Sequence, residues 1–119
     1  MKTLEFCEQF IFPILTELKT QTTLTSTGIQ KGDCVQAVIG DGIYKGMRFA
    51  QLTIKDRYKK KLGDFDSTDF MLEGVFDKAR FVEVWEKVHA GQSPDPNASV
   101  NVLRFDCTFS IQRKGENEL

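Results

Sequence analysis

The chain of 119 residues is long enough for one domain with one hydrophobic core. Its 16 basic and 17 acidic residues leave a net charge of −1, so no strong overall field attracts it to nucleic acid, and any such contact must come from a local patch. Apolar residues make up 40% of the chain, and ten phenylalanines predict a core rich in aromatic rings.

Cysteine and histidine usage argues against a disulfide framework and against a metal centre. Cys7, Cys34 and Cys107 are odd in number and far apart. The single histidine, His89, cannot supply a cluster of histidine ligands, and we expect a structural or surface role for it. We therefore expect no metal, no other cofactor and a reducing, cytoplasmic setting. The apolar run in residues 1–15 is too short and interrupted for a signal peptide or a membrane span, so no membrane contact is predicted.

The first predicted element is a helix over residues 4–18. One stripe of apolar side chains recurs there at steps of four, namely Phe6, Phe10, Ile14 and Leu18. Pro13 interrupts this stripe, because proline lacks an amide hydrogen and disfavours a helical conformation in the residue before it. We expect two short helical pieces or a kink, with the second piece running from Pro13 to about Leu18.

Strands are predicted next. Threonine-rich residues 21–25 favour a short strand, which a turn follows. Residues 34–39 and 47–54 flank a connection rich in glycine and aspartate, a pattern typical of a β-hairpin. The connection from Gly40 to Gly46 lacks the spacing of a phosphate-binding loop. The basic stretch that follows, residues 55–66, is most simply interpreted as a solvated loop.

Two helices are predicted after the basic stretch. Ser67 is expected to cap the first, with acidic Asp69 in its opening turn. The second is amphipathic, begins at the cap Asp77 and stops before Gly91. Its predicted buried face consists of Phe81, Val84, Trp85 and Val88. Trp85 is therefore assigned to the core rather than to a binding surface.

The last predicted strand spans residues 100–111. Its apolar positions change parity along the strand, which predicts a bulge near Leu103. Residues 112–119 form a polar tail that is expected to fray. The order of elements predicts one α+β domain over residues 1–111, with a mainly antiparallel sheet curled into a small β-barrel and flanked by helices.

Five stretches, in their order and spacing, resemble the ASCH domain: "ILTELKTQT", "KGD", "LTIKDRYKKKLGDF", "LEGVFDKARFVEVWEKV" and "VNVLRFDCTF". The resemblance covers roughly residues 4 to 110. It implies a β-barrel fold related to the PUA RNA-binding domain. The family signature is a glycine, a lysine two residues later and an arginine five beyond that, with a threonine between the last two in many members. Lys19 and Thr22 match it, whereas Glu17 replaces the glycine and Leu24 the arginine.

The resemblance also implies an activity. A bacterial branch of the family hydrolyses the amide of acetylcytidine to cytidine and acetate, and its proposed catalytic group corresponds here to Lys19, Thr22 and Glu73. A threonine hydroxyl is a weak nucleophile unless an adjacent base takes its proton. A neutral Lys19 is the implied base, and Glu73 would orient it or carry the proton to the leaving amine. The same three residues are also compatible with a structural or ligand-holding polar cluster.

A second hypothesis is a binding module for RNA that performs no chemistry. If the ligand is anionic, Lys45 or Arg48 must replace the cation that Leu24 removes. Arg57 and the lysines after it could follow a phosphate backbone while Tyr58 stacks on a base. Ribonuclease activity ranks last, because the chain has no pair of histidines. The expected partner is a nucleoside or RNA, and no oligomeric state follows from the sequence.

Overall fold

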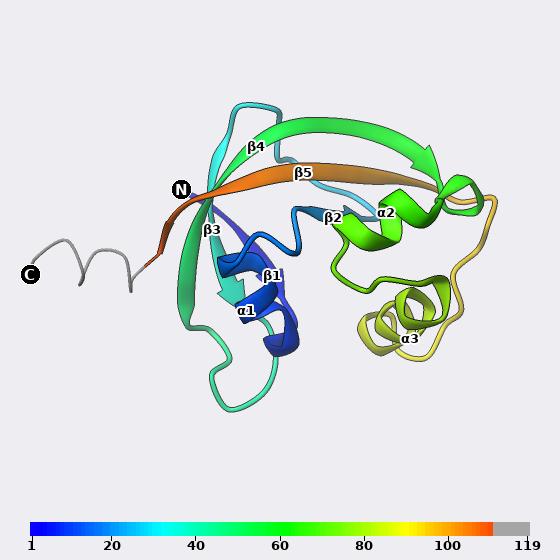
Figure 1. Cartoon of the computed structure of the whole chain (residues 1–119), viewed down its shortest axis with the longest axis horizontal. Coiled ribbons are helices and arrows are strands. Elements are labelled where there is room, and N and C mark those ends of the chain that lie inside the picture. Colours follow the sequence, from blue (N-terminus) through cyan, green and yellow to red (C-terminus); the bar gives the residue numbers. More distant parts are fainter. Residues whose placement is uncertain (111–119) are drawn as a thin grey trace, which may run out of the picture.

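The computed structural model describes residues 1–110. Five strands form one sheet in the order β1, β3, β4, β5, β2 (Figure 1). The strands are β1 (Lys2–Phe6), β2 (Gln21–Leu24), β3 (Cys34–Ile39), β4 (Arg48–Lys61) and β5 (Ser99–Ser110). Among the strands of residues 1–110, β1 and β3 pair in parallel and the other three pairs are antiparallel. The predicted tail, residues 112–119, lies outside the described residues.

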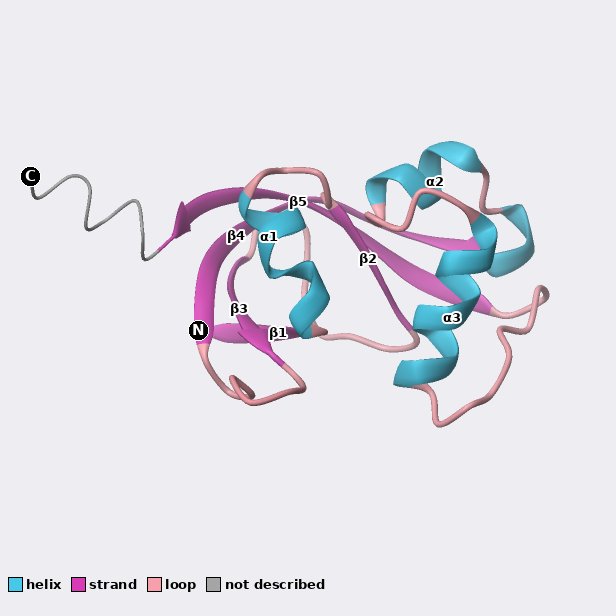
Figure 2. Cartoon of the chain, turned by 60° about the horizontal axis from the view of Figure 1, so that its bottom comes forward, coloured by secondary structure: helices cyan, strands magenta, loops and turns pink. Residues whose placement is uncertain are grey.

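The helices flank a curled sheet (Figure 2). They are η1 (Glu8–Phe10), α1 (Ile11–Leu15), η2 (Leu62–Asp64), α2 (Ser67–Leu72) and α3 (Lys78–Val88). The predicted α+β class with a mainly antiparallel sheet is confirmed. The sheet curls into a half-barrel, because β1 and β2 are its two edges and do not pair with each other. None of the helices in the described part of the chain is long and apolar enough to cross a membrane.

Strand β1 occupies residues that the helical pattern included. Leu4 and Phe6 are buried while Thr3 and Glu5 are exposed, which is the alternation of a strand. The prediction of a helix beginning at residue 4 is therefore wrong. A step of four from Phe6 to Phe10 also arises when a strand ends and a helical turn follows at once, and here η1 begins two residues after β1.

Pro13 lies inside α1 rather than between two helical pieces. It is the third residue of the helix, where an amide hydrogen would have no partner within the helix. Two short helical pieces are present, η1 and α1, but the second begins at Ile11 instead of Pro13 and does not reach Leu18. The helix ends at Leu15, and the amides of Leu18 and Lys19 both donate to the Pro13 carbonyl, at 2.8 and 3.0 Å. Glu17 turns the chain out of the helix with a left-handed φ of 63°.

The basic stretch continues β4 and is not a loop. Residues 57–61 pair with residues 99–103 of β5, whereas the pairing of β4 with β3 reaches only Thr53. Lysines on an unpaired strand edge hinder association with strands of other chains. Sheet architecture therefore accounts for much of this charge without a ligand.

The caps of the two longer helices are aspartates. Asp66, not Ser67, caps α2, because its carboxylate accepts from the Asp69 amide at 3.1 Å while the Asp69 carboxylate accepts from the Asp66 amide at 3.0 Å. This reciprocal arrangement satisfies two amides that the helix leaves free. Asp77 caps α3 as predicted, by accepting from the Arg80 amide at 2.8 Å.

The register between β4 and β5 does shift near the predicted place, but the bulge is on the neighbouring strand. The extra residue is Lys55 of β4, opposite Arg104 and Phe105, so the prediction that β5 itself bulges near Leu103 is wrong. An extra residue on either partner shifts the register equally. A second register shift leaves Thr108 of β5 as the extra residue.

The core is rich in phenylalanine, as predicted. Phe6 contacts Phe49 and Phe105 edge-on, with ring centroids 6.3 and 5.9 Å apart. Phe81 of α3 is buried, and Val84 and Trp85 pack against the core. Val88 differs from the prediction, because it is the last residue of α3 and is 59% exposed.

Candidate functional site

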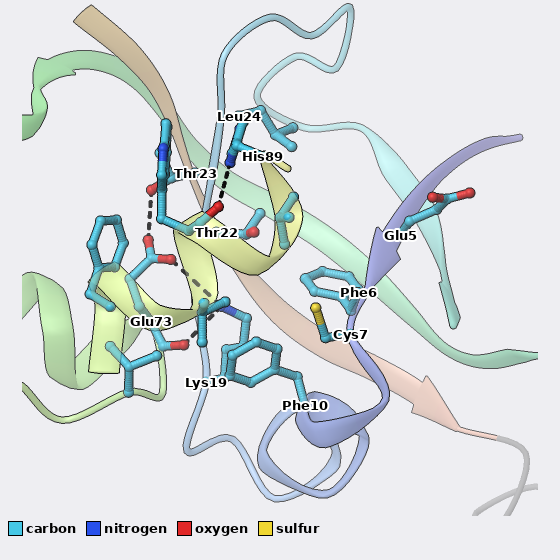
Figure 3. Close-up of a pocket in the computed structure, with 15 residues that line it drawn as sticks. Glu5, Phe6, Cys7, Phe10, Lys19, Thr22, Thr23, Leu24, Glu73 and His89 are labelled. Carbon is cyan, nitrogen blue, oxygen red and sulfur yellow. Dashed lines mark hydrogen bonds and ion pairs between the residues drawn. The ribbon is translucent and has the colours of Figure 1, made fainter. Parts of the chain in front are cut away.

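A cavity of about 120 Å³ opens between the two edge strands of the half-barrel, beside α3 (Figure 3). Its walls come from β1, η1, β2, the end of α2 and α3. The cavity exists because β1 and β2 leave the sheet open on this side. All three residues predicted to be catalytic line this cavity, namely Lys19, Thr22 and Glu73. They come from two segments about fifty residues apart.

Lys19 and Glu73 form a buried ion pair at the base of this cavity. The Lys19 Nζ atom lies 3.6 Å from Glu73 Oε1, and the two side chains are only 3% and 7% exposed. Nζ also donates to the backbone carbonyls of Gln21 and Glu73, each at 2.8 Å. The Phe10 ring covers the ammonium with its centroid 4.5 Å away. Lys19 thus has both charged and aromatic partners.

The hydroxyl bonded to Glu73 is that of Thr23, not that of Thr22. Thr23 Oγ1 donates to Glu73 Oε2 at 2.8 Å, as Figure 3 shows. Gln21 Nε2 donates to the same oxygen at 2.9 Å. Gln21 and Thr23 are two residues apart on a strand and therefore point to one face, whereas Thr22 points to the other. Within residues 1–110 the Thr22 side chain makes no hydrogen bond, although it lines the cavity.

Burial shifts both members of the ion pair toward their neutral forms. It lowers the pKa of Lys19, while the neighbouring Glu73 carboxylate opposes that change. Burial also raises the pKa of Glu73, against the opposing charge of Lys19 and the hydrogen bonds from Gln21 and Thr23. Glu73 is thus a carboxyl group whose affinity for a proton is increased by burial.

A polar network behind the cavity fixes the position of Gln21. Its Nε2 also donates to Asp69 Oδ1 at 3.3 Å, and its Oε1 accepts from Arg104 Nε at 3.2 Å. Asp69 is held by Lys60, whose Nζ lies 2.8 Å from Oδ2. Burial alone would raise the pKa of Asp69, but hydrogen bonds from Lys60, the Asp66 amide and Gln21 lower it overall. Lys60 therefore offsets the buried charge of Asp69 behind the site.

Two backbone positions allow Lys19 to reach this place. Gly74 has φ of 79°, and a Cβ atom there would lie 2.9 Å from the Lys19 Cβ. Only glycine combines that conformation with that close approach. Glu17 has φ of 63° at the position where the ASCH signature has glycine. The left-handed φ explains why the signature has glycine at that position. In this chain Glu17 adopts the same conformation, which strains a residue that has a Cβ atom.

Aromatic side chains form the other wall of the cavity. The rings of Trp85 and His89 stack with centroids 4.0 Å apart and an angle of 16°, and His89 Nδ1 lies 2.9 Å from the Trp85 carbonyl oxygen. Both residues line the cavity, together with Phe6 and Phe10. The assignment of Trp85 to the core alone is therefore incomplete. The stripe in the sequence shows that this face of α3 is covered, but not that it also borders a cavity.

No protein-family model matches the chain, and no curated protein matches its sequence. Solved structures do match it. The protein EF3133 from Enterococcus faecalis V583, of family model DUF984, has a TM-score of 0.73 at 11% identity, covering 98% of this chain and 81% of its own. An ASCH domain from Lactobacillus crispatus JV V101 has a TM-score of 0.61 at 13% identity, covering 89% and 78%. A point mutant of ZmASCH from Zymomonas mobilis has a TM-score of 0.62 at 6% identity, covering 96% and 78%.

The chain has the ASCH-domain fold. The fold predicted from the sequence stretches is thereby confirmed, and a similarity at these identities shows the fold alone. Within the described residues of this ASCH fold, no group of three or more histidine, cysteine, aspartate or glutamate side chains is placed to hold a metal ion. The expectation that the protein uses no metal or other cofactor stays a prediction.

The other predicted ligand-binding residues lie outside the cavity of this ASCH fold. Lys45 and Arg48 do not line it, so neither supplies the cation missing at Leu24, which does line it. The Arg57 guanidinium donates to the Ile29 carbonyl at 2.8 Å and to Asn101 Oδ1 at 3.4 Å. Tyr58 is covered by the guanidinium of Arg104, 5.6 Å from its ring centroid. The contacts of Arg57 and Tyr58 are those of side chains that stabilise the sheet.

Proposed function

We propose that the cavity binds a neutral nucleoside derived from RNA, of the modified-cytidine class, and hydrolyses the amide of acetylcytidine. The observation that carries this proposal is the meeting of Lys19, Glu73 and two threonine hydroxyls in one partly aromatic cavity. Lys19, Glu73 and one of these threonines match the proposed catalytic group of the bacterial proteins that the sequence resembles, which hydrolyse this amide. The arrangement offers a carboxylate to move a proton, a hydroxyl to attack and a cation to hold the carboxylate.

The charge of the cavity favours a neutral ligand over a phosphate chain. Among the described residues that line it, Lys19 is the only lysine or arginine, and its charge is already paired with Glu73. Glu5 adds a second carboxylate at the rim, where its side chain points away from the cavity (Figure 3). A phosphate group would find no free cation among these side chains, so a nucleoside fits better than a nucleotide or an RNA backbone.

The shape and lining of the cavity favour one planar ring. Sites for drug-sized ligands enclose about 300–1,000 Å³, and this cavity is smaller, at about 120 Å³. Phe10, Trp85 and His89 present ring faces or edges along it. A pyrimidine carrying a small acyl group offers the matching combination of flat surface and polar edge. A stretch of several stacked bases would need a longer platform.

The alternative function is RNA binding without chemistry, and one observation favours it. Lys59 and Lys61 are exposed on the part of β4 that pairs on one side only, so they present a short row of cations to solvent. Such a row would bind a phosphate backbone with strong dependence on salt. It lies on a different part of the sheet from the cavity and needs neither Lys19 nor Glu73.

Incubation with acetylcytidine, followed by chromatography for released cytidine and acetate, tests the proposal. We expect product that increases with protein concentration and with time, and its loss in Glu73→Ala protein that still folds. Calorimetry with cytidine measures binding separately. A folded wild-type protein that binds neither cytidine nor acetylcytidine at millimolar concentration would contradict the nucleoside assignment. Salt-dependent binding of a single-stranded RNA in that protein, lost on Lys59→Ala and Lys61→Ala, would favour the alternative.

A further inference from the structure

We propose that Glu73 is the proton acceptor of this site and that it activates the hydroxyl of Thr23, while Lys19 remains an ammonium that holds Glu73 in place. This assignment rests on the proposed hydrolysis of an acetyl amide. It differs from the assignment implied by the sequence resemblance, in which Lys19 is the base and Thr22 the hydroxyl. Three independent features of the geometry support it.

The first feature is the surroundings of Lys19 Nζ. An ammonium has three N–H donors and no lone pair. Nζ donates to the Gln21 carbonyl and the Glu73 carbonyl, each at 2.8 Å, and Glu73 Oε1 lies 3.6 Å away as its ion-pair partner. A neutral amine would turn its lone pair toward one of these oxygens or toward the Phe10 ring face, 4.5 Å away. Each of these contacts is repulsive for a lone pair and attractive for a cation.

The second feature is the choice of hydroxyl. Thr23 Oγ1 already donates its hydrogen to Glu73 Oε2 at 2.8 Å, and Thr23 lines the cavity. Nucleophile and base are thus within the reach that proton transfer requires. In the described part of the chain, Thr22 Oγ1 has no hydrogen bond to either Lys19 or Glu73. Strand parity separates the two threonines, so only one of them can serve this carboxylate at a time.

The third feature is the support of the carboxylate. Gln21 Nε2 donates to the same Oε2 atom at 2.9 Å, and Gln21 is fully buried and held by Asp69 and Arg104. Glu73 is therefore fixed from the side of Oε1 by Lys19 and from the side of Oε2 by Gln21. The Thr23 proton can pass to Oε2 without rotation of the carboxylate. Such fixed positioning lowers the barrier to proton transfer.

The backbone of β2 supplies a donor for the charge that develops. The Thr20 carbonyl accepts from the Phe105 amide at 2.9 Å, and Thr22 pairs with Leu103 two residues on. Hydrogen bonding alternates along an antiparallel pair, so the Gln21 and Thr23 amides point away from β5, toward the open side of the sheet. An amide in that place can donate to the oxyanion formed when a hydroxyl attacks a carbonyl.

The proposed reaction proceeds through an acetyl ester of Thr23. Thr23 Oγ1 attacks the acetyl carbon and gives its proton to Glu73, forming a C–O bond and an oxyanion. The C–N bond of the amide then breaks, and the leaving amine of cytidine takes the proton from Glu73. Water attacks the resulting acetyl ester of Thr23, giving a proton to Glu73, and the ester C–O bond breaks. Glu73 returns that proton to Thr23 Oγ1, which releases acetic acid and restores the site.

The test compares Thr23→Val with Thr22→Val, two nearly isosteric changes that each remove one hydroxyl. We expect kcat/KM for acetylcytidine to fall at least about 100-fold in Thr23→Val, the range for loss of a positioned proton-transfer group. The fall in Thr22→Val should be smaller than that in Thr23→Val by a factor of at least about ten. Thr23→Ser keeps the hydroxyl and is expected to retain turnover. Cytidine affinity and the thermal midpoint, measured on the same proteins, show that binding and folding persist. Peptide mass spectrometry after an acid quench should find an acetyl group on Thr23.

Several outcomes would overturn this assignment. An acetyl group on Thr22, or a larger loss in Thr22→Val, would place the nucleophile at Thr22. Full turnover in both valine variants would make water the nucleophile. Wild-type protein that binds cytidine but releases none from acetylcytidine would overturn the assignment and leave nucleoside binding intact. Absence of both binding and turnover would overturn the proposed function, and the assignment with it.

Discussion

Removing either member of the Lys19–Glu73 pair is expected to destabilise the fold strongly, with opposite dependence on pH. The relevant variants are Lys19→Met, Glu73→Gln and the double variant. Both side chains are more than nine-tenths buried, so each single change leaves one buried group without its opposite charge. Breaking a buried pair in this way costs about 3–5 kcal/mol, out of a total stability of about 5–15 kcal/mol for a domain. The double variant should cost less than the sum of the singles by about 1–3 kcal/mol.

The sign of the pH dependence follows from which group remains. In Lys19→Met the remaining Glu73 has a pKa that burial raises above its usual 4.5. Protonation then relieves the buried charge, so the cost of this variant shrinks as pH falls through the raised pKa of Glu73 toward 4.5. In Glu73→Gln the remaining Lys19 has a pKa that burial lowers below its usual 10.5. The cost of that variant shrinks as pH rises through the lowered pKa of Lys19 toward 10.5.

Urea unfolding, followed by the fluorescence of the single tryptophan, Trp85, measures these costs between about pH 5 and pH 9. The matched control is Lys2→Met, which removes a lysine from an ion pair with Asp33 that is 51% exposed on the lysine side. An exposed pair contributes about 0–1 kcal/mol. Costs below about 1 kcal/mol for both buried variants, or pH slopes of the same sign, would refute the view that these two groups are charged and depend on each other.

Three further changes test other parts of the structure. Glu17→Gly should raise stability in urea unfolding by about 1 kcal/mol, because φ of 63° strains any residue with a Cβ atom, and an unchanged midpoint would contradict this strain. Asp66→Ala should lower stability by about 1 kcal/mol through loss of the α2 cap, whereas Ser67→Ala should have little effect, and equal losses would contradict the cap assignment. Leu24→Arg should place a cation in the cavity and strengthen the binding of cytidine monophosphate about tenfold in calorimetry, with a smaller increase in affinity at high salt. An increase in affinity that does not depend on salt would argue against a phosphate contact.

Most of the sheet follows from alternation and turn residues, and the errors occur where one pattern fits two structures. The sequence predicts residues 34–39 and 21–24 as strands to within one residue, because residues 34–39 alternate between the two faces and residues 21–24 contain two β-branched threonines. The sequence of strand β1 also fits a helical pattern, because the strand is only five residues long and a helical turn follows it closely. The sequence of the outer half of β4 is typical of a solvated loop, because its charge reflects an unpaired edge and edge position depends on the whole sheet.

The sequence likewise predicts some features of the site and leaves others undetermined. The sequence alone does not bring Lys19 next to Glu73, since they lie 54 positions apart, and only the resemblance to a family predicted this approach. The choice between Thr22 and Thr23 depends on which face of β2 meets Glu73. That face is set by the register of β2 against β5, and a shift of one residue would exchange the two hydroxyls. Neighbouring threonines in a sequence therefore identify the strand but not the hydroxyl.

The polar interior beside the cavity is better explained by function than by stability. Lys19, Gln21, Asp69 and Glu73 are all buried, and within the described residues every buried side-chain nitrogen or oxygen has a hydrogen-bond partner. Replacing buried ion pairs with apolar side chains of similar volume is often neutral or stabilising in proteins. A half-barrel with ten phenylalanines could fill this space with apolar atoms. The charges instead converge on one carboxylate that borders a cavity, on the side where the edge strands β1 and β2 stay unpaired with each other. A stable core does not require this arrangement, but proton transfer does. The buried charges therefore support the proposal that this cavity is the functional site.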